Sequence, residues 1–417
     1  MSEALQQRPA SAISLAAIDV SDPGLYEADT WGPYFARLRA QDPVHYCASS
    51  PFGPFWSVTK FKDIMHVDMH HDVFSSEGAI VIGDQGEDFR IENFIQMDPP
   101  RHDQQRRAVQ PTVAPRNLAQ LEGVIRSRAA AILDALPIGE TFDWVDRVSI
   151  ELTTQMLATL FDFPFEERRK LTYWSDLSTA APEQTGGDLF TKEERESGLM
   201  ECLRVFTALF HERAARPPGE TLDFVTMLAH GADTKDMTSR PMEFLGNIML
   251  LIVGGNDTTR NSISGGILAL HEFPDEYAKV RANPALIPSM VSEMVRWQSP
   301  VIHMRRTALV DTELGGKQIK AGDKVVMWYL SGNRDADAVD NPDAFIIDRL
   351  GARQHVAFGF GVHRCMGNRM AEMQLRVLFE EIFQRFDRVE VVGRPERLRS
   401  NFIRGITHLP VRLHARR

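Results

Sequence analysis

The stretch FGFGVHRCMGNRM, residues Phe358 to Met370, sets a lone cysteine, Cys365, among three glycines. Glycine carries no Cβ, so these positions let the backbone pass close to a flat partner. If a helix begins directly after the cysteine, its first backbone N–H groups point at the sulfur and favour its anionic form. The stretch therefore predicts a sulfur that stays a thiolate and faces a bound group.

Two other uses of the cysteine fit this setting less well. A zinc site takes about four ligands, usually in Cys or His pairs, and only His363 lies close to Cys365 in the sequence. A catalytic nucleophile needs a base with an orienting partner, and His363 is the base at hand. A thiolate held by amide hydrogen bonds and shielded by Phe358 instead suits an iron that needs electron donation along one axis.

The spacing Phe358-x-x-Gly361-x-His363-x-Cys365-x-Gly367 resembles the haem-binding signature of the cytochrome P450 superfamily, the haem-thiolate monooxygenases. Agreement at all of these fixed positions is rare by chance. The resemblance implies haem b as cofactor, with Cys365 as its axial thiolate ligand and Phe358 beside the sulfur. It also implies the cytochrome P450 fold, in which a single large domain, mainly α with a minor β lobe, encloses the haem.

The periodicity of apolar residues supports the same fold class. Apolar residues recur at helical spacing from residue 114 to Pro137, and the first 110 residues mix short strand-like runs with turns rich in glycine and proline. We expect further helices over 146–161, 191–215, 242–272, 285–298 and 368–386. Nothing along the chain resembles a linker, so we expect a flexible segment over 1–20 and one domain over 21–417.

Composition argues against two classes of partner. The formal net charge is −10 at pH 7, which leaves no concentrated basic surface for a nucleic acid. The ISLAAI run near the N-terminus is much shorter than the roughly 20 apolar residues that span a bilayer, and no cleavage signal accompanies it. We therefore expect a cytoplasmic protein with no nucleic-acid partner and no transmembrane anchor.

The segment LLIVGGNDTTRNS, residues 250–262, lies inside the helix expected over 242–272. A glycine inside a helix costs about 1 kcal/mol relative to alanine, and the close approach of a flat ligand at Gly254 is one compensating gain. The hydroxyl of Thr258 can donate to the carbonyl of Gly254, one turn earlier. The segment resembles the family's acid-alcohol pair, which implies that Asp257 and Thr258 deliver protons during dioxygen cleavage. A plain helix packing site is the alternative.

Two further sets of residues match the family's pattern. The structural triad that holds the haem face in register is matched by Glu293, Arg296 and Arg349. The basic partners of the two haem propionates are matched by His102, Arg106, Arg306 and His363. Taken one at a time, each of these basic residues could equally be a solvated surface group.

Longer segments such as DTWGPYF, FGPFWSVTK and DKVVMWYLSGNRD resemble the soluble bacterial alkane and fatty-acid terminal hydroxylases. The resemblance implies hydroxylation of a medium-chain alkane or fatty acid at its terminal carbon, with dioxygen and with two electrons from a separate ferredoxin and ferredoxin reductase. Two alternatives remain: a hydroxylase of a bulkier steroid, terpenoid or macrolide, and a non-oxygenase haem sensor. Sensors often have a Cys-Pro motif, whereas Met366 follows the cysteine here.

A terminal hydroxylase needs a narrow apolar channel, because a methyl C–H bond is stronger than the methylene C–H bond beside it and geometry must override that difference. Apolar residues near the motifs are candidates for its wall, although an apolar stripe is more often plain core. The candidates are Ile80, Ile82, Phe94, Leu250, Leu251, Val253, Val301, Ile302, Phe402 and Ile403.

Overall fold

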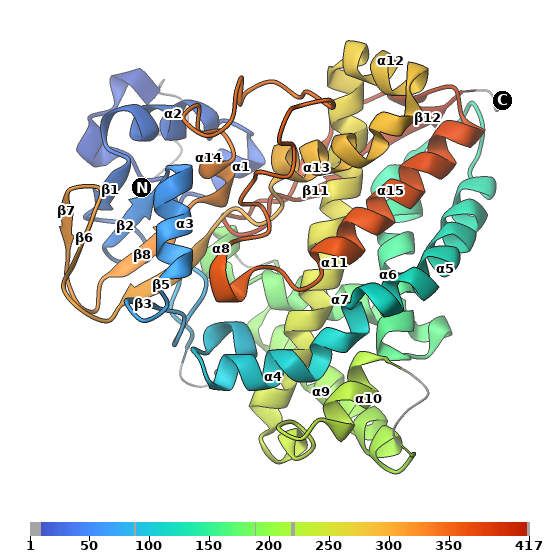
Figure 1. Ribbon diagram of the computed structural model, residues 1–417, viewed down its shortest axis with the longest axis horizontal. Helices are drawn as coiled ribbons and strands as arrows, with labels where there is room; N and C mark the ends of the chain where they lie inside the picture. Colours follow the sequence, from blue (N-terminus) through green and yellow to red (C-terminus); the bar gives the residue numbers. More distant parts are fainter. Residues whose placement is uncertain (1–9, 87–88, 188, 218–221, 415–417) are drawn as a thin grey trace.

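The computed structural model describes residues 10–86, 89–187, 189–217 and 222–414. Helices form most of the molecule, and a small sheet lobe lies at one side (Figure 1). The α-helices are α1 (Gly24–Glu27), α2 (Gly32–Gln41), α3 (Phe61–Met69), α4 (Arg101–Val109), α5 (Pro115–Asp134), α6 (Glu151–Phe161), α7 (Arg169–Thr179), α8 (Pro182–Thr185), α9 (Lys192–Ala214), α10 (Phe224–His230), α11 (Pro241–Glu272), α12 (Pro274–Ala282), α13 (Ile287–Gln298), α14 (Tyr329–Gly332) and α15 (Asn368–Arg385).

The strands form one larger sheet and three smaller ones. They are β1 (Val44–Cys47), β2 (Phe55–Val58), β3 (Phe74–Ser75), β4 (Thr141–Asp143), β5 (Met304–Ala308), β6 (Thr312–Leu314), β7 (Lys317–Ile319), β8 (Lys324–Met327), β9 (Val389–Val391), β10 (Glu396–Arg397), β11 (Ile406–His408) and β12 (Pro410–Leu413). The larger sheet has the order β1-β2-β8-β5-β3, and β2 and β8 are its parallel pair. The early strand-like runs therefore pair with strands that come more than 200 residues later.

The mainly α fold class with a minor β lobe is confirmed. Each helix expected from apolar periodicity is present with its ends shifted by a few residues, and a π-helical segment, Val145–Ile150, precedes α6. Apolar periodicity does not indicate α2, α3, α4, α7, α10 or α12. In α4 the reason is plain, because its sequence RHDQQRRAV is almost entirely polar and buries only His102, Gln105 and Val109. A helix without an apolar stripe gives no periodic signal.

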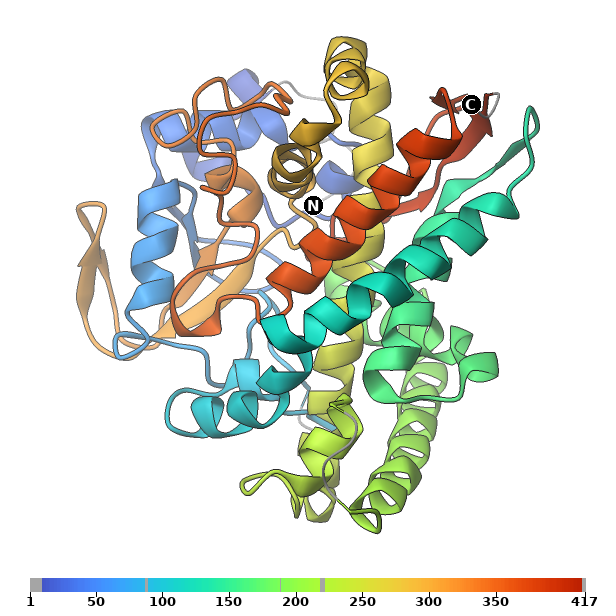
Figure 2. The ribbon, with the colours of Figure 1, turned by 45° about the vertical axis from the view of Figure 1, so that its right-hand side comes forward.

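Helix α11 runs through the middle of the molecule and is buried on nearly all sides. It packs against α6, α7, α13 and α15, while α15 in turn lies across α5 (Figures 1 and 2). A helix that is apolar around most of its circumference is expected to lie in a core. Within the described ranges, no helix is long and apolar enough to cross a membrane.

Residues 10–20 differ from the flexible segment that we expected over 1–20. Ala10, Ile13, Ile18 and Val20 are buried in a second apolar core beside Trp328. Residues 1–9 lie outside the described part of the chain. The short apolar run that is too brief to span a membrane thus serves as packing for the sheet lobe.

A buried carboxylate, Glu293 on α13, joins this helix to the loop before the cysteine stretch. It accepts two hydrogen bonds of 2.7 Å from Arg296, two of 3.1 and 3.2 Å from Arg349, and one of 2.9 Å from the backbone N–H of Ile346. Burial raises the pKa of Glu293, but the hydrogen bonds from the two arginines and Ile346, together with the charge of Arg296, outweigh it and hold this pKa below its ordinary value. The structure therefore brings together the three residues of the expected triad.

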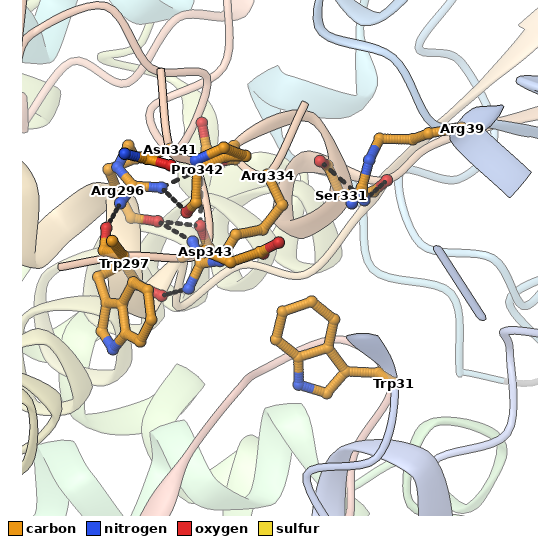
Figure 3. A network of polar contacts seen from close by, with 12 residues as sticks. Trp31, Arg39, Arg296, Trp297, Ser331, Arg334, Asn341, Pro342 and Asp343 are labelled. Carbon is orange, nitrogen blue, oxygen red and sulfur yellow. Dashed lines mark hydrogen bonds and ion pairs between the residues drawn. The ribbon is translucent and has the colours of Figure 1, made fainter. Parts of the chain in front are cut away.

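A second arginine, Arg334, crosses the same region. Its guanidinium lies 4.1 Å from the ring centre of Trp297 and 5.8 Å from that of Trp31, and it donates to the carbonyl oxygen of Trp297 at 2.9 Å. Figure 3 shows Arg296 and Arg334 side by side, with Arg296 donating to the carbonyl oxygen of Pro342 at 2.9 Å. The loop over 333–349 is thus held by arginine side chains that donate to backbone carbonyls.

Glu293→Ala should destabilise the protein severely, because Arg296 and Arg349 would keep buried charges without a counter-ion. Removing one partner of a buried pair typically costs about 3–5 kcal/mol. The matched control is Glu122→Ala, since Glu122 also pairs with two arginines, Arg126 and Arg376, but at the surface, where pairs contribute about 0–1 kcal/mol. Urea unfolding of the haem-loaded protein measures both; equal losses would contradict the buried role of Glu293.

Candidate active site

The cysteine loop, residues 358–367, leads directly into α15. The backbone N–H of Cys365 donates to the carbonyl oxygen of Phe358 at 2.8 Å, which closes the loop. Gly361 has a φ of 63°, and a Cβ at this position would overlap the carbonyl oxygen of Asp68 at the end of α3. Glycine is therefore required where the loop meets α3.

The sulfur of Cys365 faces a cavity and receives hydrogen bonds from the backbone N–H groups of Gly367 and Asn368, at the start of α15. Burial raises the pKa of this thiol, whereas those hydrogen bonds and the charge of Arg106 oppose the shift. A metal ion that binds a thiol deprotonates it. The hydrogen bonds of the loop therefore need to supply only part of the stabilisation of the Cys365 thiolate. In the described ranges, no group of three or more His, Cys, Asp or Glu side chains is placed to hold a metal, so the zinc alternative finds no companion ligands there.

The cavity lies between the cysteine loop and α11 and has a volume of about 230 Å³. Gly254 on α11 and Gly367 in the loop both line it, and a Cβ added at either position would meet no atom within 4 Å. Phe358 lines the same space beside Cys365. The open space at both glycines fits a flat group held between α11 and the sulfur.

Two buried histidine nitrogens have no hydrogen-bond partner in the described part of the chain, Nε2 of His102 and Nδ1 of His363. Their ring centres are 4.3 Å apart, and the opposite ring nitrogens contact Asp103 at 2.8 Å and Ser76 at 2.9 Å. Burial lowers the pKa of both rings, to about 2 for His363, and the carboxylate of Asp103 opposes this shift at His102. Buried polar nitrogens normally have partners, and the carboxylates of a haem would supply them.

The two arginines expected at the propionates also line the cavity. Arg106 donates to the carbonyl oxygen of Arg364 in the cysteine loop at 2.6 Å. Arg306 pairs with the buried carboxylate of Asp68 at 3.0 Å. Together with His363, which also lines the cavity, they form a basic edge to the space between α11 and the sulfur. His102 packs against His363 but does not itself line the cavity. The residues present therefore fit a haem in both shape and charge.

Thr258 bends back on its own helix as the sequence predicts. Its hydroxyl donates to the carbonyl oxygen of Gly254 at 2.7 Å, and the side chain lines the cavity. A hydroxyl on the α11 side of the cavity is well placed to pass a proton toward the space opposite the sulfur.

Asp257 does not reach the cavity in this structure. Its carboxylate is buried against α7, where it forms an ion pair with Arg260 and accepts a hydrogen bond of 2.8 Å from Ser175. Burial raises the pKa of Asp257, while the charge of Arg260 opposes that shift. The sequence reasoning missed this arrangement, although the spacing of Asp257 and Arg260 is a signal for a pair on one helix face.

The cavity wall contains about half of the residues expected at a substrate channel. Those that line it are Ile80, Phe94, Leu250, Leu251 and Val301. Other apolar residues line the cavity as well, among them Ile95, Met156, Leu157, Val295 and Met304. Most of these lie on helices whose inward face cannot be told from ordinary core by periodicity.

The other expected wall residues do not line the cavity. Ile82 and Ile302 lie in the second apolar core beside Trp328, and Val253 packs against the main core. Phe402 and Ile403 are buried beside residues 301–302: the carbonyl of Phe402 accepts from the N–H of Ile302, and Ile403 forms a β-bridge with Val301. Alternate side chains of an extended segment face opposite ways, which places Val301 on the cavity and Ile302 in the core.

Comparison with known proteins gives consistent matches. The model of the cytochrome P450 family matches residues 283–410. The linalool 8-monooxygenase of Pseudomonas putida is 38% identical over 406 residues, which covers 94% of this chain and 98% of that protein. A methyl-branched lipid omega-hydroxylase of Mycobacterium bovis is 31% identical over 393 residues and covers 90% of each chain. The structure of cytochrome P450-153 from Novosphingobium aromaticivorans is 45% identical, with a TM-score of 0.88 over 95% of this chain and 99% of that one.

Cys365→Ser should abolish the red-shifted absorption band that a thiolate-ligated ferrous haem shows with carbon monoxide, because the donor sulfur is lost. Cys202→Ser is the matched control, since that thiol is buried in the main core. A band that persists in Cys365→Ser and disappears in the control would show that the wrong sulfur was chosen.

Thr258→Ala should retain the haem and still consume reductant, but release more hydrogen peroxide and less product, because the hydroxyl that hands protons to the reaction is missing. General acid–base groups typically contribute about 10²–10⁴-fold, so we expect at least a tenfold loss of product per electron pair. The ratio of product to reductant consumed measures this. An unchanged ratio would remove Thr258 from the proton path.

Proposed function

The chain belongs to the cytochrome P450 family, and from that premise we propose that it hydroxylates the terminal carbon of medium-chain alkanes or fatty acids. As a cytochrome P450 monooxygenase, it uses haem b with an axial cysteine thiolate, dioxygen and electrons from redox partners. We infer that Cys365 provides the thiolate, and that a separate ferredoxin and ferredoxin reductase supply the electrons. The steps below concern what the side chains of this chain do.

The haem site is formed by groups on opposite sides of the cavity. Cys365 would hold the iron from the cysteine loop, and Gly254 on α11 would leave room for the cofactor. His102, Arg106, Arg306 and His363 would bind the propionates. When bound, the haem activates dioxygen and inserts one of its oxygen atoms into a C–H bond.

Protons reach the space opposite the sulfur through Thr258. In this role the hydroxyl exchanges its bond to the carbonyl of Gly254 for one to a group in the cavity. Asp257 reprotonates the Thr258 oxygen only after its own carboxyl group has separated from Ser175 and Arg260. Its burial, which raises its pKa, favours a carboxyl that can carry a proton when the ion pair opens.

The observation that carries the substrate proposal is the apolar wall on the α11 side of the cavity. Leu250 and Leu251 precede the glycine pair, Phe94 and Ile95 come from the loop before α4, and Val301 comes from the segment after α13. Such a wall binds a hydrocarbon chain through burial of its apolar surface. The omega-hydroxylase among the relatives supports the same regiochemistry.

A terpenoid hydroxylase is the second candidate, and the 38% identity to a linalool 8-monooxygenase favours it. A branched terpenoid is wider than a straight chain, so the two functions differ in the width that the cavity wall must admit. Competition between linalool and octane for the unmodified enzyme separates them. Preferential turnover of linalool would favour the second candidate over the first.

Val301→Ala should lower the ratio of terminal to internal alcohol formed from octane, because a shorter side chain widens the space beside the reacting carbon. A change of about 1.4 kcal/mol in positional preference alters this ratio tenfold, and we expect a decrease of about threefold to tenfold. The neighbouring variant Ile302→Ala is the control, since Ile302 is buried in the second core and does not line the cavity.

Gas chromatography of the alcohols gives the ratio for all three proteins. Ile302→Ala should cost stability, as large-to-small core substitutions do, and leave the ratio unchanged. A shift in Ile302→Ala without one in Val301→Ala would contradict this account of the wall. Mainly internal alcohols from the unmodified enzyme would refute terminal hydroxylation itself.

A further inference from the structure

Residues 92–96, here called the roof segment, form part of the cavity wall. The position of this segment depends on its contacts with the N-terminal half of α11. Phe94 and Ile95 of this segment line the cavity, and Leu250 and Leu251 on α11 line it one turn beyond the contact. Both groups therefore bound the space that a substrate would occupy. The contacts that fix this segment to α11 therefore influence substrate specificity.

One contact is a buried side chain, Asn247. Its Oδ1 accepts a hydrogen bond of 3.0 Å from the backbone N–H of Phe94. Its Nδ2 donates to the carbonyl oxygen of Glu243, one turn earlier, at 3.1 Å and to Oε1 of Gln105 on α4 at 2.9 Å. Asn247 is only 1% exposed, so a lost partner here would not be replaced easily by water.

The second contact is a glycine next to it. A Cβ at Gly246 would overlap the carbonyl oxygen of Glu92, because the backbone of the roof segment lies directly on the helix at this point. Gly246 is in the helix interior, where glycine is unfavourable relative to alanine. The close approach of the roof segment is the gain that offsets this cost.

The asparagine is itself held in place by a buried polar chain. Gln105 donates to Oε1 of Glu243 at 2.7 Å, and Glu243 also pairs with Arg240 at 3.2 Å. These side-chain hydrogen bonds join α4, which carries Arg106 of the basic edge, to α11. The orientation of the Asn247 amide is thereby fixed, with its oxygen toward Phe94.

We propose that Gly246 and Asn247 form a roof clamp that makes Asn247 a specificity-determining residue, one that positions Phe94 and so restricts the cavity to slender hydrocarbon chains. The inference rests on the proposed terminal hydroxylation and extends it by naming what sets the width of the site. Asn247 touches neither haem nor the reacting carbon; it acts through Phe94. The clamp is local, because it consists of one hydrogen bond from the backbone N–H of Phe94 to the Asn247 side chain and the close backbone approach of Glu92 to Gly246.

The test compares Asn247→Ala with a matched variant on the same helix, Asn261→Ala. Asn261 is also buried; its Oδ1 accepts from the N–H of Ile406 at 2.9 Å, and its Nδ2 donates to the carbonyl of Asp257, one turn earlier, at 2.8 Å. Each variant loses a bond to a distant backbone and a bond within α11, and Asn247→Ala also loses the bond to Gln105 on α4. They differ in which segment is released, the cavity roof or β11.

Three readouts are taken on the haem-loaded proteins. Hydrogen exchange of the Phe94 amide should become at least about tenfold faster in Asn247→Ala, because its acceptor is gone. The ratio of binding constants for linalool and octane, from substrate titration, should move toward linalool. The ratio of terminal to internal octanol should fall. In Asn261→Ala all three should match the unmodified enzyme.

Unchanged exchange, binding and product ratios in Asn247→Ala would overturn the clamp, as would equal changes in both variants, which would indicate general loosening. If Asn247→Ala fails to fold, Gly246→Ala replaces it: the added methyl pushes the roof segment from α11 and should shift the binding and product ratios in the same direction, while no shift overturns the proposal. Internal products from the unmodified enzyme would refute terminal hydroxylation, whereas amide exchange at Phe94 still reports on the clamp.

Discussion

A buried carboxylate, Asp68, holds the cysteine loop in the shape on which the site depends. It accepts hydrogen bonds from Arg306 at 3.0 Å, from the hydroxyl of Tyr329 at 2.9 Å and from the backbone N–H of Phe360 at 3.0 Å. Burial raises the pKa of Asp68, and the charge of Arg306 is the strongest influence against that shift. Because one carboxylate binds both the loop and a cation that lines the cavity, the sulfur and the basic edge are positioned together.

Helix α11 supplies the opposite side of the site, and different turns of it have different tasks. Gly246 and Asn247 hold the roof segment, Gly254 leaves space for the flat cofactor, and Thr258 carries the hydroxyl that faces the cavity. The central position of the helix explains this arrangement, since every layer of the molecule can contact it. A shift of α11 would therefore move the contacts of the roof segment, Gly254 and Thr258 together.

The sequence predicts the parts of the site that depend on neighbouring residues. The glycines around Cys365 and the bond from Thr258 to Gly254 follow from local backbone geometry. By contrast, Arg306 meets Asp68 across 238 positions, and Phe94 meets Asn247 across 153, so no local pattern reveals these contacts. The choice of Ile302 for the channel was wrong in this structure for a related reason: apolar character does not say whether a side chain faces a cavity or a core.

The most direct measurement of the central claim is the spin-state change of the haem in the unmodified enzyme, titrated with straight-chain alkanes, fatty acids, steroids, terpenoids and macrolides. It reports how closely a molecule approaches the iron and needs no redox partner. The apolar wall and its fixed roof predict the largest change and the tightest binding for a medium straight-chain alkane or fatty acid. A saturating change with a steroid, terpenoid or macrolide, and none with straight chains, would contradict the account.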